Sequence, residues 1–315
     1  YRVKISDDQM LASAIEGFAS EPSVEFAEPN YIVTAMAMPN DPDLTRLWGI
    51  KNTGQADSSG KVGTAGMDIG VDALWEAGQT GSKDVVVAVI DTGVSWAHPD
   101  LKDNIYVNKG EIPNNNVDDD KNGFVDDVHG WNFAGDNKNS SDDHDHGTHC
   151  AGTIGAMGNN GVGVVGVNWN VSIMPIKFLT ASGSGTTADA IESINYATKM
   201  KVHVMSNSWG GGGESQAMKQ SIQAARDAGI LFVAAAGNDS SNNDRTPTYP
   251  ANYDVENVVS VAAMDNQGVL ASFSNYGVTK VHVAAPGVRV LSTVKSGGYD
   301  TFSGTSMATP HVAGV

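Results

Sequence analysis

The sequence predicts an α/β protein with three layers, in which a mostly parallel central sheet lies between two layers of helices. From residue 40 onward, short continuous apolar runs alternate with segments of helical periodicity. Strands buried on both faces have continuous apolar sequences, and their alternation with helices is typical of a parallel sheet. The 36 glycines and the 17% share of charged residues suit a compact enzyme with many tight turns.

Residues 1–38 are predicted to form a small α+β unit in front of the main domain, which would span residues 39–315. So short a segment buries too little apolar surface to be stable alone, and we therefore expect it to dock on the rest of the chain. The alanines and methionines between residues 35 and 39 indicate a linker or a cleavage region.

Within this N-terminal unit, the segments 1–5 and 24–26 read as short strands, the first because its polar and apolar residues alternate. Asp7 can cap a helix that follows the first strand. That helix would carry three apolar residues on one face: Leu11, Ile15 and Phe18.

In the main domain, six apolar runs are predicted as strands of the central sheet: 85–90, 171–179, 202–205, 230–236, 258–262 and 281–285. Apolar periodicity predicts helices over 187–199 and 214–228, and Gly229 suits the left-handed position that ends the second helix. Ligands bind at the carboxyl ends of the strands in such sheets. Asp91 and Asn238 each follow a strand end, so we expect both at this functional edge.

The charge of the chain excludes some classes of function. The 19 Lys+Arg and 36 Asp+Glu residues give a formal net charge of −17. So acidic a protein repels nucleic acids and anionic membranes, and it has no apolar run near the roughly 20 residues of a membrane-spanning helix. The single cysteine, Cys150, excludes an intrachain disulfide and reads as a small core residue. These features suit a soluble, secreted monomer that binds calcium.

The two ends of the sequence suggest a longer precursor. The chain begins at Tyr1 without a methionine or a signal peptide, and it ends at Val315, soon after a predicted helix begins. We therefore expect a secreted protein whose signal peptide lies outside this segment, and a main domain that lacks its C-terminal part.

Ser306 lies in a stretch of small residues, 304–314, that predicts a turn followed by a helix. A serine in the first turn of a helix is surrounded by unpaired backbone N–H groups, which stabilise a developing oxyanion. The alternative is a structural role, because Gly-Thr-Ser is also a common helix start.

Three other polar residues have settings that suit the same chemistry. Asp91 follows a predicted strand, and Asn238 follows the small-residue run that ends at Gly237, although each could be a plain turn residue. His146 begins a predicted helix. A zinc site with His144 and His149 is the alternative for His146, but a helix rich in glycine and alanine makes a poor zinc cage.

The order Asp, His, Asn and Ser along the chain is that of a nucleophilic hydrolase. Four segments resemble the signature motifs of subtilisin-like serine proteases (the subtilases): 89–93, 146–152, 235–238 and 304–311. The resemblance extends from about residue 40 to the end of the chain. Residues 1–38 resemble the C-terminal part of the inhibitory propeptide of this family, most closely over 24–31.

The resemblance implies a secreted serine endopeptidase that cleaves proteins or peptides through an acyl-enzyme. In such an enzyme Ser306 would attack the peptide carbonyl, His146 would transfer the proton, and Asp91 would orient His146. Asn238 and the backbone N–H of Ser306 would stabilise the oxyanion. The N-terminal unit would serve as an intramolecular inhibitor and folding aid.

The resemblance also implies residues that contact the substrate. Two edge segments would pair with an extended peptide, which would become a β-strand between them: Gly183, Ser184 and Gly185 on one side, and Ser208, Trp209 and Gly210 on the other. Without the resemblance, both segments could equally be flexible turns. Small residues would line the pocket before the scissile bond and allow broad specificity: Ala235, Ala236 and Gly237.

Calcium is the cofactor that the resemblance implies. The side chains of Asp41, Asp100 and Asn160 match ligand positions of the high-affinity site of the family. Backbone carbonyls would complete that site: those of Met157, Val162 and Val164. Oxygen ligands from distant loops are what Ca²⁺ requires.

A second calcium site is predicted in the acidic loop 118–127. Its ligands would be Asp118, Asp120, Asn122 and Asp127. The spacing of the first three matches an EF-hand loop, but the twelfth position is His129 rather than glutamate, so the loop is not an EF-hand. The alternative is an acidic loop that is only solvated.

The sequence departs from the family at one position. Subtilases commonly have an aspartate in the strand before the segment 285–287, where this chain has His282. A weaker cation site of the family, near Ala251 and Tyr253, is therefore in doubt here.

Two other functions remain open at this stage. The first is a latent form of the same enzyme, in which the propeptide remnant occupies the substrate groove. The second is an acidic calcium-binding module without catalysis, which would explain the loop 118–127 but not the four polar residues together.

Overall fold

The computed structural model describes residues 3–5, 10–29 and 38–315. The chain divides into two compact units, Tyr1–Met36 and Ala37–Val315. The first unit contains α1 (Leu11–Ala19), where Ala14 is buried and Leu11 is exposed. The expected strands are not formed at residues 3–5 and 24–26, because among the described residues no strand pairs with the backbone groups of either segment. Asp7 and residues 35–37 of the predicted linker lie outside the described residues.

The second unit is built on a seven-stranded sheet in which every pair of neighbouring strands is parallel. In spatial order the strands are β2 (Trp131–Asn132), β3 (Asn170–Lys177), β1 (Gly81–Asp91), β4 (Val204–Asn207), β5 (Leu231–Ala235), β6 (Val258–Met264) and β7 (Val283–Pro286). The prediction of a mostly parallel central sheet is confirmed. Six of these strands correspond to the predicted apolar runs, and β2 was not predicted because it has only two residues.

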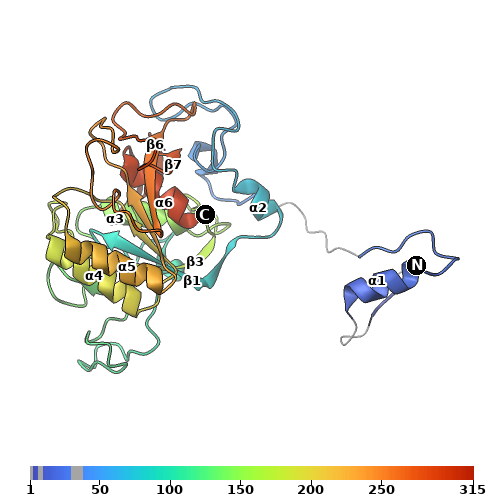
Figure 1. The fold of residues 1–315 in the computed structure, drawn as a ribbon, viewed down its shortest axis with the longest axis horizontal. Helices are drawn as coiled ribbons and strands as arrows, with labels where there is room; N and C mark the ends of the chain where they lie inside the picture. The colour runs from blue at the N-terminus through green and yellow to red at the C-terminus, as the bar shows by residue number, and fades with distance from the viewer. Residues whose placement is uncertain (1–2, 6–9, 30–37) are drawn as a thin grey trace. The chain divides into compact units, whose positions relative to one another are not determined.

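Helices cover both faces of this sheet, so the predicted three-layer arrangement is also confirmed (Figure 1). On one face lie α4 (Thr187–Lys199) and α5 (Gln216–Asp227), and on the other lie α3 (His146–Gly155) and α6 (Thr305–Gly314). The short helices are α2 (Asp72–Glu76), η1 (Leu44–Arg46) and η2 (Lys102–Asn104).

The central strand β1 shows why the predicted runs are apolar throughout. Val89 and Ile90 are both fully buried, but Val89 packs in the cluster of α3 and α6, and Ile90 in the cluster of α4 and α5. Successive side chains of a strand point to opposite faces, so a strand covered on both faces needs apolar residues at every position.

Local capping sets the ends of the two helices that were predicted from periodicity. The side chain of Thr186 accepts a hydrogen bond from the N–H of Asp189 at the start of α4, and Ser215 does the same for Met218 in α5. Gly229 follows the end of α5 with φ +78°, a conformation that is favourable only for glycine at this position.

A two-stranded antiparallel hairpin that was not predicted precedes the last helix. It consists of β8 (Val290–Thr293) and β9 (Tyr299–Phe302). The hairpin packs on α3, because Nε2 of His149 is 3.0 Å from the carbonyl oxygen of Val290 and the ring of His149 stacks on Phe302. Among the described residues, the structure contains no helix with the length and apolar character needed to span a bilayer.

Because it contains two buried histidines, we expect the fold to lose stability in acid. Burial lowers the pKa of His149 and of His311 from 6.5 to about 4. The unfolded chain therefore binds more protons between these values, and the stabilisation that is complete above pH 6.5 is lost as the pH falls toward 4. Each histidine contributes a slope of about 1.4 kcal/mol per pH unit in this window.

The measurement is the free energy of unfolding in urea as a function of pH. Part of the slope of the unfolding free energy against pH comes from the two histidines. We expect His149→Gln, which keeps a donor for Val290, to remove about half of that part. An unchanged slope in this variant would show that His149 is not the titrating group.

Candidate active site

The carboxyl end of β1 meets the start of α3 in a direct hydrogen bond. Asp91 is the last residue of β1 and is fully buried, and His146 is the first residue of α3. The imidazole Nδ1–H donates to Oδ1 of Asp91 at 2.8 Å. Because a carboxylate can only accept, this bond places the proton of a neutral imidazole on Nδ1 and leaves Nε2 as an acceptor.

The backbone around Asp91 is fixed by the neighbouring strand. The carbonyl oxygen of Asp91 accepts hydrogen bonds from the N–H groups of Phe178 and Leu179. Next to these residues, the buried Nζ of Lys177 donates to the carbonyl oxygen of Thr92 at 2.8 Å and to a carboxylate oxygen of Asp143 at 2.7 Å. These contacts hold the end of β1, and with it the carboxylate of Asp91.

Asp142 ties the start of α3 to the same strand end. Its Oδ1 accepts from the hydroxyl of Thr92 at 2.9 Å, and its Oδ2 accepts from the N–H and the hydroxyl of Thr148. The hydroxyl oxygen of Thr92 in turn accepts from the N–H of Gly147 at 2.9 Å. Asp142 was not predicted as a site residue, and because it is buried it is not the surface charge that an aspartate in an acidic run suggests.

The surroundings of His146 change its basicity in two opposing ways. Burial lowers the pKa of His146, but the charge of Asp91, the hydrogen bond to Asp91 and the charge of Asp142 together raise it above its ordinary value. The pair of carboxylates therefore favours the protonated imidazolium, which is the form that a general base reaches after it accepts a proton.

Ser306 is the second residue of α6 and lies between the end of β4 and the side of α3. Its hydroxyl donates to the carbonyl oxygen of Ser208 at 2.9 Å, and the hydroxyl of Ser208 donates to the carbonyl oxygen of Ser306 at 2.8 Å. The thiol of Cys150 on α3 also faces this carbonyl oxygen, at 3.5 Å. In this arrangement the hydroxyl of Ser306 is bonded to Ser208 and not to His146.

Asn238 is bonded to the residue before Ser306. Its Oδ1 accepts from the N–H of Thr305 at 2.8 Å and from the hydroxyl of Thr305 at 3.0 Å. These two donors fix which atom of the amide is oxygen. Within the described part of the chain, Nδ2 of Asn238 has no hydrogen-bond partner, so a donor remains free beside the N-terminus of α6.

The two predicted edge segments line one cavity of about 590 Å³ together with His146. The segment residues in its lining are Gly183, Ser184, Gly185, Ser208, Trp209 and Gly210. At its apolar end, the rings of Phe178 and Trp209 meet edge to face, with centroids 4.8 Å apart. The structure therefore brings both segments and His146 to one groove.

The predicted pocket residues Ala235, Ala236 and Gly237 are placed differently. Ala235 is the last residue of β5, and Ala236 and Gly237 follow it. Both alanines are buried, and none of the three residues belongs to the lining of this groove. Gly237 donates its N–H to the hydroxyl oxygen of Thr305 at 3.3 Å, so the segment supports the start of α6.

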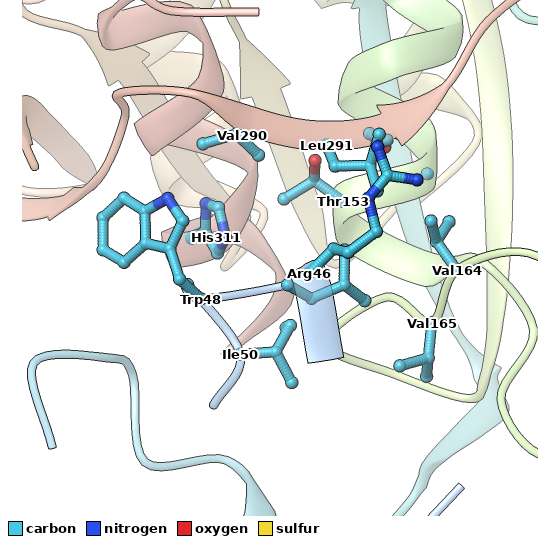
Figure 2. A pocket seen from close by; sticks show the side chains of 13 residues that line it. Arg46, Trp48, Ile50, Thr153, Val164, Val165, Val290, Leu291 and His311 are labelled. Atoms are coloured by element: carbon cyan, nitrogen blue, oxygen red, sulfur yellow. The ribbon is translucent and has the colours of Figure 1, made fainter. Parts of the chain in front are cut away.

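A second cavity, shown in Figure 2, is a packing void rather than a site. It measures about 20 Å³ and is lined by residues that include Trp48, Leu291 and His311. A space of this size holds about one water molecule. Nδ1 of His311 is 2.9 Å from the carbonyl oxygen of Met307, so the histidine is already bonded within its own helix.

Two carboxylates of the first predicted calcium site lie at one loop. Asp41 and Asp100 are both buried, and among the described residues neither forms an ion pair. Asp41 accepts from the N–H of Asn159 at 2.7 Å, and Asp100 accepts from the side chain of Asn160 at 2.8 Å and the N–H of Val164 at 2.9 Å. Burial raises the pKa of Asp41, and the charge of Asp100 adds to this effect.

This chemistry fits a hard cation. Buried carboxylates that repel one another are stabilised when a divalent ion lies between them, and Ca²⁺ prefers oxygen ligands. The N–H of Met157 donates to the carbonyl oxygen of Asp100 at 2.8 Å, and Val162 and Val164 follow in the same loop. The predicted set is therefore gathered in one place.

The acidic loop 118–127 is arranged differently from the prediction. One oxygen from each of Glu111, Asp120 and Asp127 lies within 4.8 Å of the others. Asp118 instead accepts from the N–H groups of Asn122 and Gly123 in its own loop. Nδ2 of Asn122 donates to Asp127 at 2.8 Å. Glu111 was not predicted because it lies seven residues before the acidic run.

Comparisons with known proteins agree with the fold. The chain matches the family described as the Subtilase family over residues 82–315. It is 35% identical over 306 residues to the thermophilic serine proteinase of Bacillus sp. (strain AK1), an alignment that covers 97% of this chain and 65% of that protein. It is 40% identical over 247 residues to subtilisin DY of Bacillus licheniformis, with 78% of this chain and 80% of the relative covered.

A solved structure shows the same similarity in three dimensions. The crystal structure of a cold adapted subtilisin-like serine proteinase matches with a TM-score of 0.59 and 35% sequence identity. The match covers 74% of this chain and 73% of that chain.

Proposed function

The chain belongs to the subtilase family of serine proteases, and from that premise we propose that it hydrolyses peptide bonds through Asp91, His146 and Ser306. The observation that carries the proposal is the 2.8 Å hydrogen bond from Nδ1 of His146 to the buried Asp91, together with the contact of Ser306, in the first turn of α6, with Cys150 on the same helix as His146. Such a pair leaves Nε2 free to accept the proton of a serine hydroxyl.

In the proposed reaction, the hydroxyl of Ser306 first turns from the carbonyl oxygen of Ser208 toward His146. As the bond from Oγ to the substrate carbonyl carbon forms, the proton of the hydroxyl passes to Nε2 of His146. His146 then gives this proton to the leaving amine as the carbon–nitrogen bond breaks, and a water molecule releases the acyl group by the same steps. Asp91 keeps the imidazole in one tautomer and stabilises its charge.

Two donors at the start of α6 would stabilise the oxyanion of this reaction. The N–H of Ser306 belongs to the first turn of the helix, where backbone donors have no partner within the helix. Nδ2 of Asn238 is the second donor, because its Oδ1 is engaged by Thr305. Donors of this kind stabilise the charge that develops only in the transition state.

We further propose that the substrate is an extended protein or peptide with few sequence requirements. The groove lies between the segments 183–185 and 208–210, whose glycines allow the backbone of a peptide to approach closely. The rings of Phe178 and Trp209, which also line the groove, suit an apolar side chain of a substrate whose scissile bond lies at Ser306. Ala235, Ala236 and Gly237 remain the proposed wall of the pocket next to that bond.

The N-terminal unit is proposed to be the end of an inhibitory propeptide of a secreted, monomeric enzyme. We expect a chain that begins at residue 39 to hydrolyse casein faster than the chain of 315 residues, and a peptide of residues 1–38 to slow it again. Casein hydrolysis that is absent from both folded forms would contradict the catalytic proposal. Equal rates with and without residues 1–38 would contradict the inhibitory role alone.

Calcium is proposed to stabilise the main domain. Asp41, Asp100 and Asn160 would hold one ion together with carbonyls of Met157, Val162 and Val164. The loop 118–127, with Glu111 as an added carboxylate, would hold another through Asp120 and Asp127. The ion would compensate the charge of the buried carboxylates, and the proton transfers proposed above would not involve it.

Removal of calcium is therefore expected to destabilise the protein. A site that is saturated at about 100 times its dissociation constant stabilises the fold by about 2.7 kcal/mol, so a chelator should lower the midpoint of thermal unfolding by several degrees. Asp100→Asn should remove most of this calcium-dependent part, and Asp254→Asn, which changes a fully exposed carboxylate, should leave it intact. A wild-type unfolding midpoint that does not respond to chelation would contradict the calcium proposal.

A further inference from the structure

The residue directly before His146 has a strained backbone. Asp145 has φ 108° and ψ −26°, in the left-handed region that glycine adopts readily and other residues rarely adopt. Such a conformation is unfavourable for a residue with a Cβ atom and persists only where the surroundings hold it. Asp145 is the N-cap that directly precedes α3, so its backbone angles set the direction of the first helical turn and the position of the imidazole.

Every polar atom of Asp145 is bonded. Its N–H donates to Oδ1 of Asp142 at 3.2 Å, and its carbonyl oxygen accepts from the N–H of His149 at 3.0 Å. Oδ1 accepts from the backbone N–H of Lys295 at 2.9 Å, and Oδ2 forms an ion pair with Nζ of Lys295 at 3.2 Å. The carboxylate makes no capping bond to α3, so it does not act as an ordinary helix cap.

Lys295 lies in the turn between β8 and β9, which touches the other active-site loops as well. Its carbonyl oxygen accepts from the hydroxyl of Ser95 at 3.2 Å, in the segment that follows Asp91. Gly298 in the same turn is bonded to His98 at 3.0 Å. Strand β9 ends at Phe302, four residues before Ser306. One turn is therefore linked to the segments that carry all three residues of the proposed triad.

We propose that Asp145 is a positioning residue, whose strained backbone, held by Lys295, places His146 for proton transfer. The inference rests on the proposed function for its kinetic readout. A glycine at this position would adopt the same backbone angles without strain. An alanine would be strained at these angles, and it would lack the carboxylate that holds the backbone through Lys295. The backbone role of Asp145 can therefore be separated from the loss of its charge.

The test compares Asp145→Ala with Asp145→Gly, which both lack the carboxylate. Rates are normalised to the concentration of sites that a serine-directed phosphonofluoridate titrates, so that unfolded protein is not counted. We expect Asp145→Ala to lower kcat by about 10- to 100-fold with KM changed by less than about threefold, and Asp145→Gly to recover at least tenfold of that loss. Equal kcat values for the two variants, whether high or low, would overturn the proposal.

Asp136 offers a matched control, because it is an exposed aspartate with φ 47° outside the groove. Asp136→Ala and Asp136→Gly should differ in thermal stability but have equal kcat. If Asp145→Ala does not fold, Lys295→Met takes its place: it keeps the backbone donor but removes the ion pair, and it should lower kcat with KM unchanged. A kcat of Lys295→Met equal to that of the wild type would then overturn the proposal that the turn between β8 and β9 holds Asp145 in place.

A second readout does not need activity. In a Ser306→Ala background, the imidazole N–H proton that His146 donates to Asp91 is followed by NMR. We expect this resonance to be retained in Asp145→Gly and to shift or broaden in Asp145→Ala. If the wild-type chain is inactive but the two variants still differ in this resonance, the proposed function is contradicted and the positioning role is supported. Identical spectra of the two variants would overturn the positioning role.

Discussion

Replacing Ser306 by alanine is expected to lower kcat on the order of 10⁶-fold, the effect of losing the nucleophile in a subtilisin. The hydroxyl of Ser306 is the atom that would attack the substrate, and no other side chain beside His146 takes its place in the proposed reaction. The residual rate would come from the groove and the oxyanion donors, which remain. The measurement is kcat on a peptide substrate, with thermal unfolding to verify that the variant is folded.

A matched control lies three residues earlier on the chain. Ser303 is exposed and accepts a hydrogen bond from the N–H of Arg289, so Ser303→Ala should leave kcat within about threefold of the wild type. Hydrolysis that persists in Ser306→Ala at the wild-type rate would show that another residue is the nucleophile.

Replacing Asp91 by asparagine is expected to lower kcat by about 10⁴-fold without unfolding the protein. Oδ1 of Asp91 accepts hydrogen bonds both from Nδ1 of His146 and from the N–H of Thr92, and these two bonds hold the carboxylate in place. An asparagine amide can donate to Nδ1, which moves the imidazole proton to Nε2. Nε2 would then face Ser306 as a donor and could not accept the proton of its hydroxyl.

The same variant should change the pH dependence of the reaction. Although burial lowers the pKa of His146, the charge of Asp91 helps to raise it above its ordinary value, so removing that charge lowers the pKa. The acid limb of kcat/KM against pH, which follows the protonation of His146, should move to lower pH. If Asp91→Asn lowers kcat by less than about tenfold and the acid limb of the pH profile does not shift, the role assigned to Asp91 is contradicted.

The parts of the fold that the sequence predicts are those with a local signal. Val89 and Ile90 belong to an apolar run because both faces of β1 are covered, and the bounds of α4 follow from its periodicity and its cap at Thr186. The hairpin of β8 and β9 has no such signal. It depends on His149, more than 140 residues earlier in the chain, and contacts of that range cannot be read from a short window.

The candidate site divides in the same way. The resemblance of their segments to subtilase motifs implied that Asp91 and His146 act as a pair, and a hydrogen bond of 2.8 Å joins the two side chains. The hydrogen bond between Asp145 and Lys295 joins residues that are 150 positions apart, so no sequence motif indicates it. Likewise, Glu111 could not be assigned to the acidic cluster until the chain had folded. The hydrogen bond from Ser306 to Ser208 depends on a rotamer, which a sequence does not determine.

Covalent labelling tests the proposed nucleophile most directly. The protein, in buffer that contains calcium, is treated with a serine-directed phosphonofluoridate and digested, and the modified peptide is identified by mass spectrometry. The proposed mechanism predicts one added phosphonyl group, on Ser306, with no modification of the Ser306→Ala variant. A modification at any other serine, or an unmodified Ser306 in a folded protein that hydrolyses peptides, would contradict the assignment of Ser306 as the nucleophile.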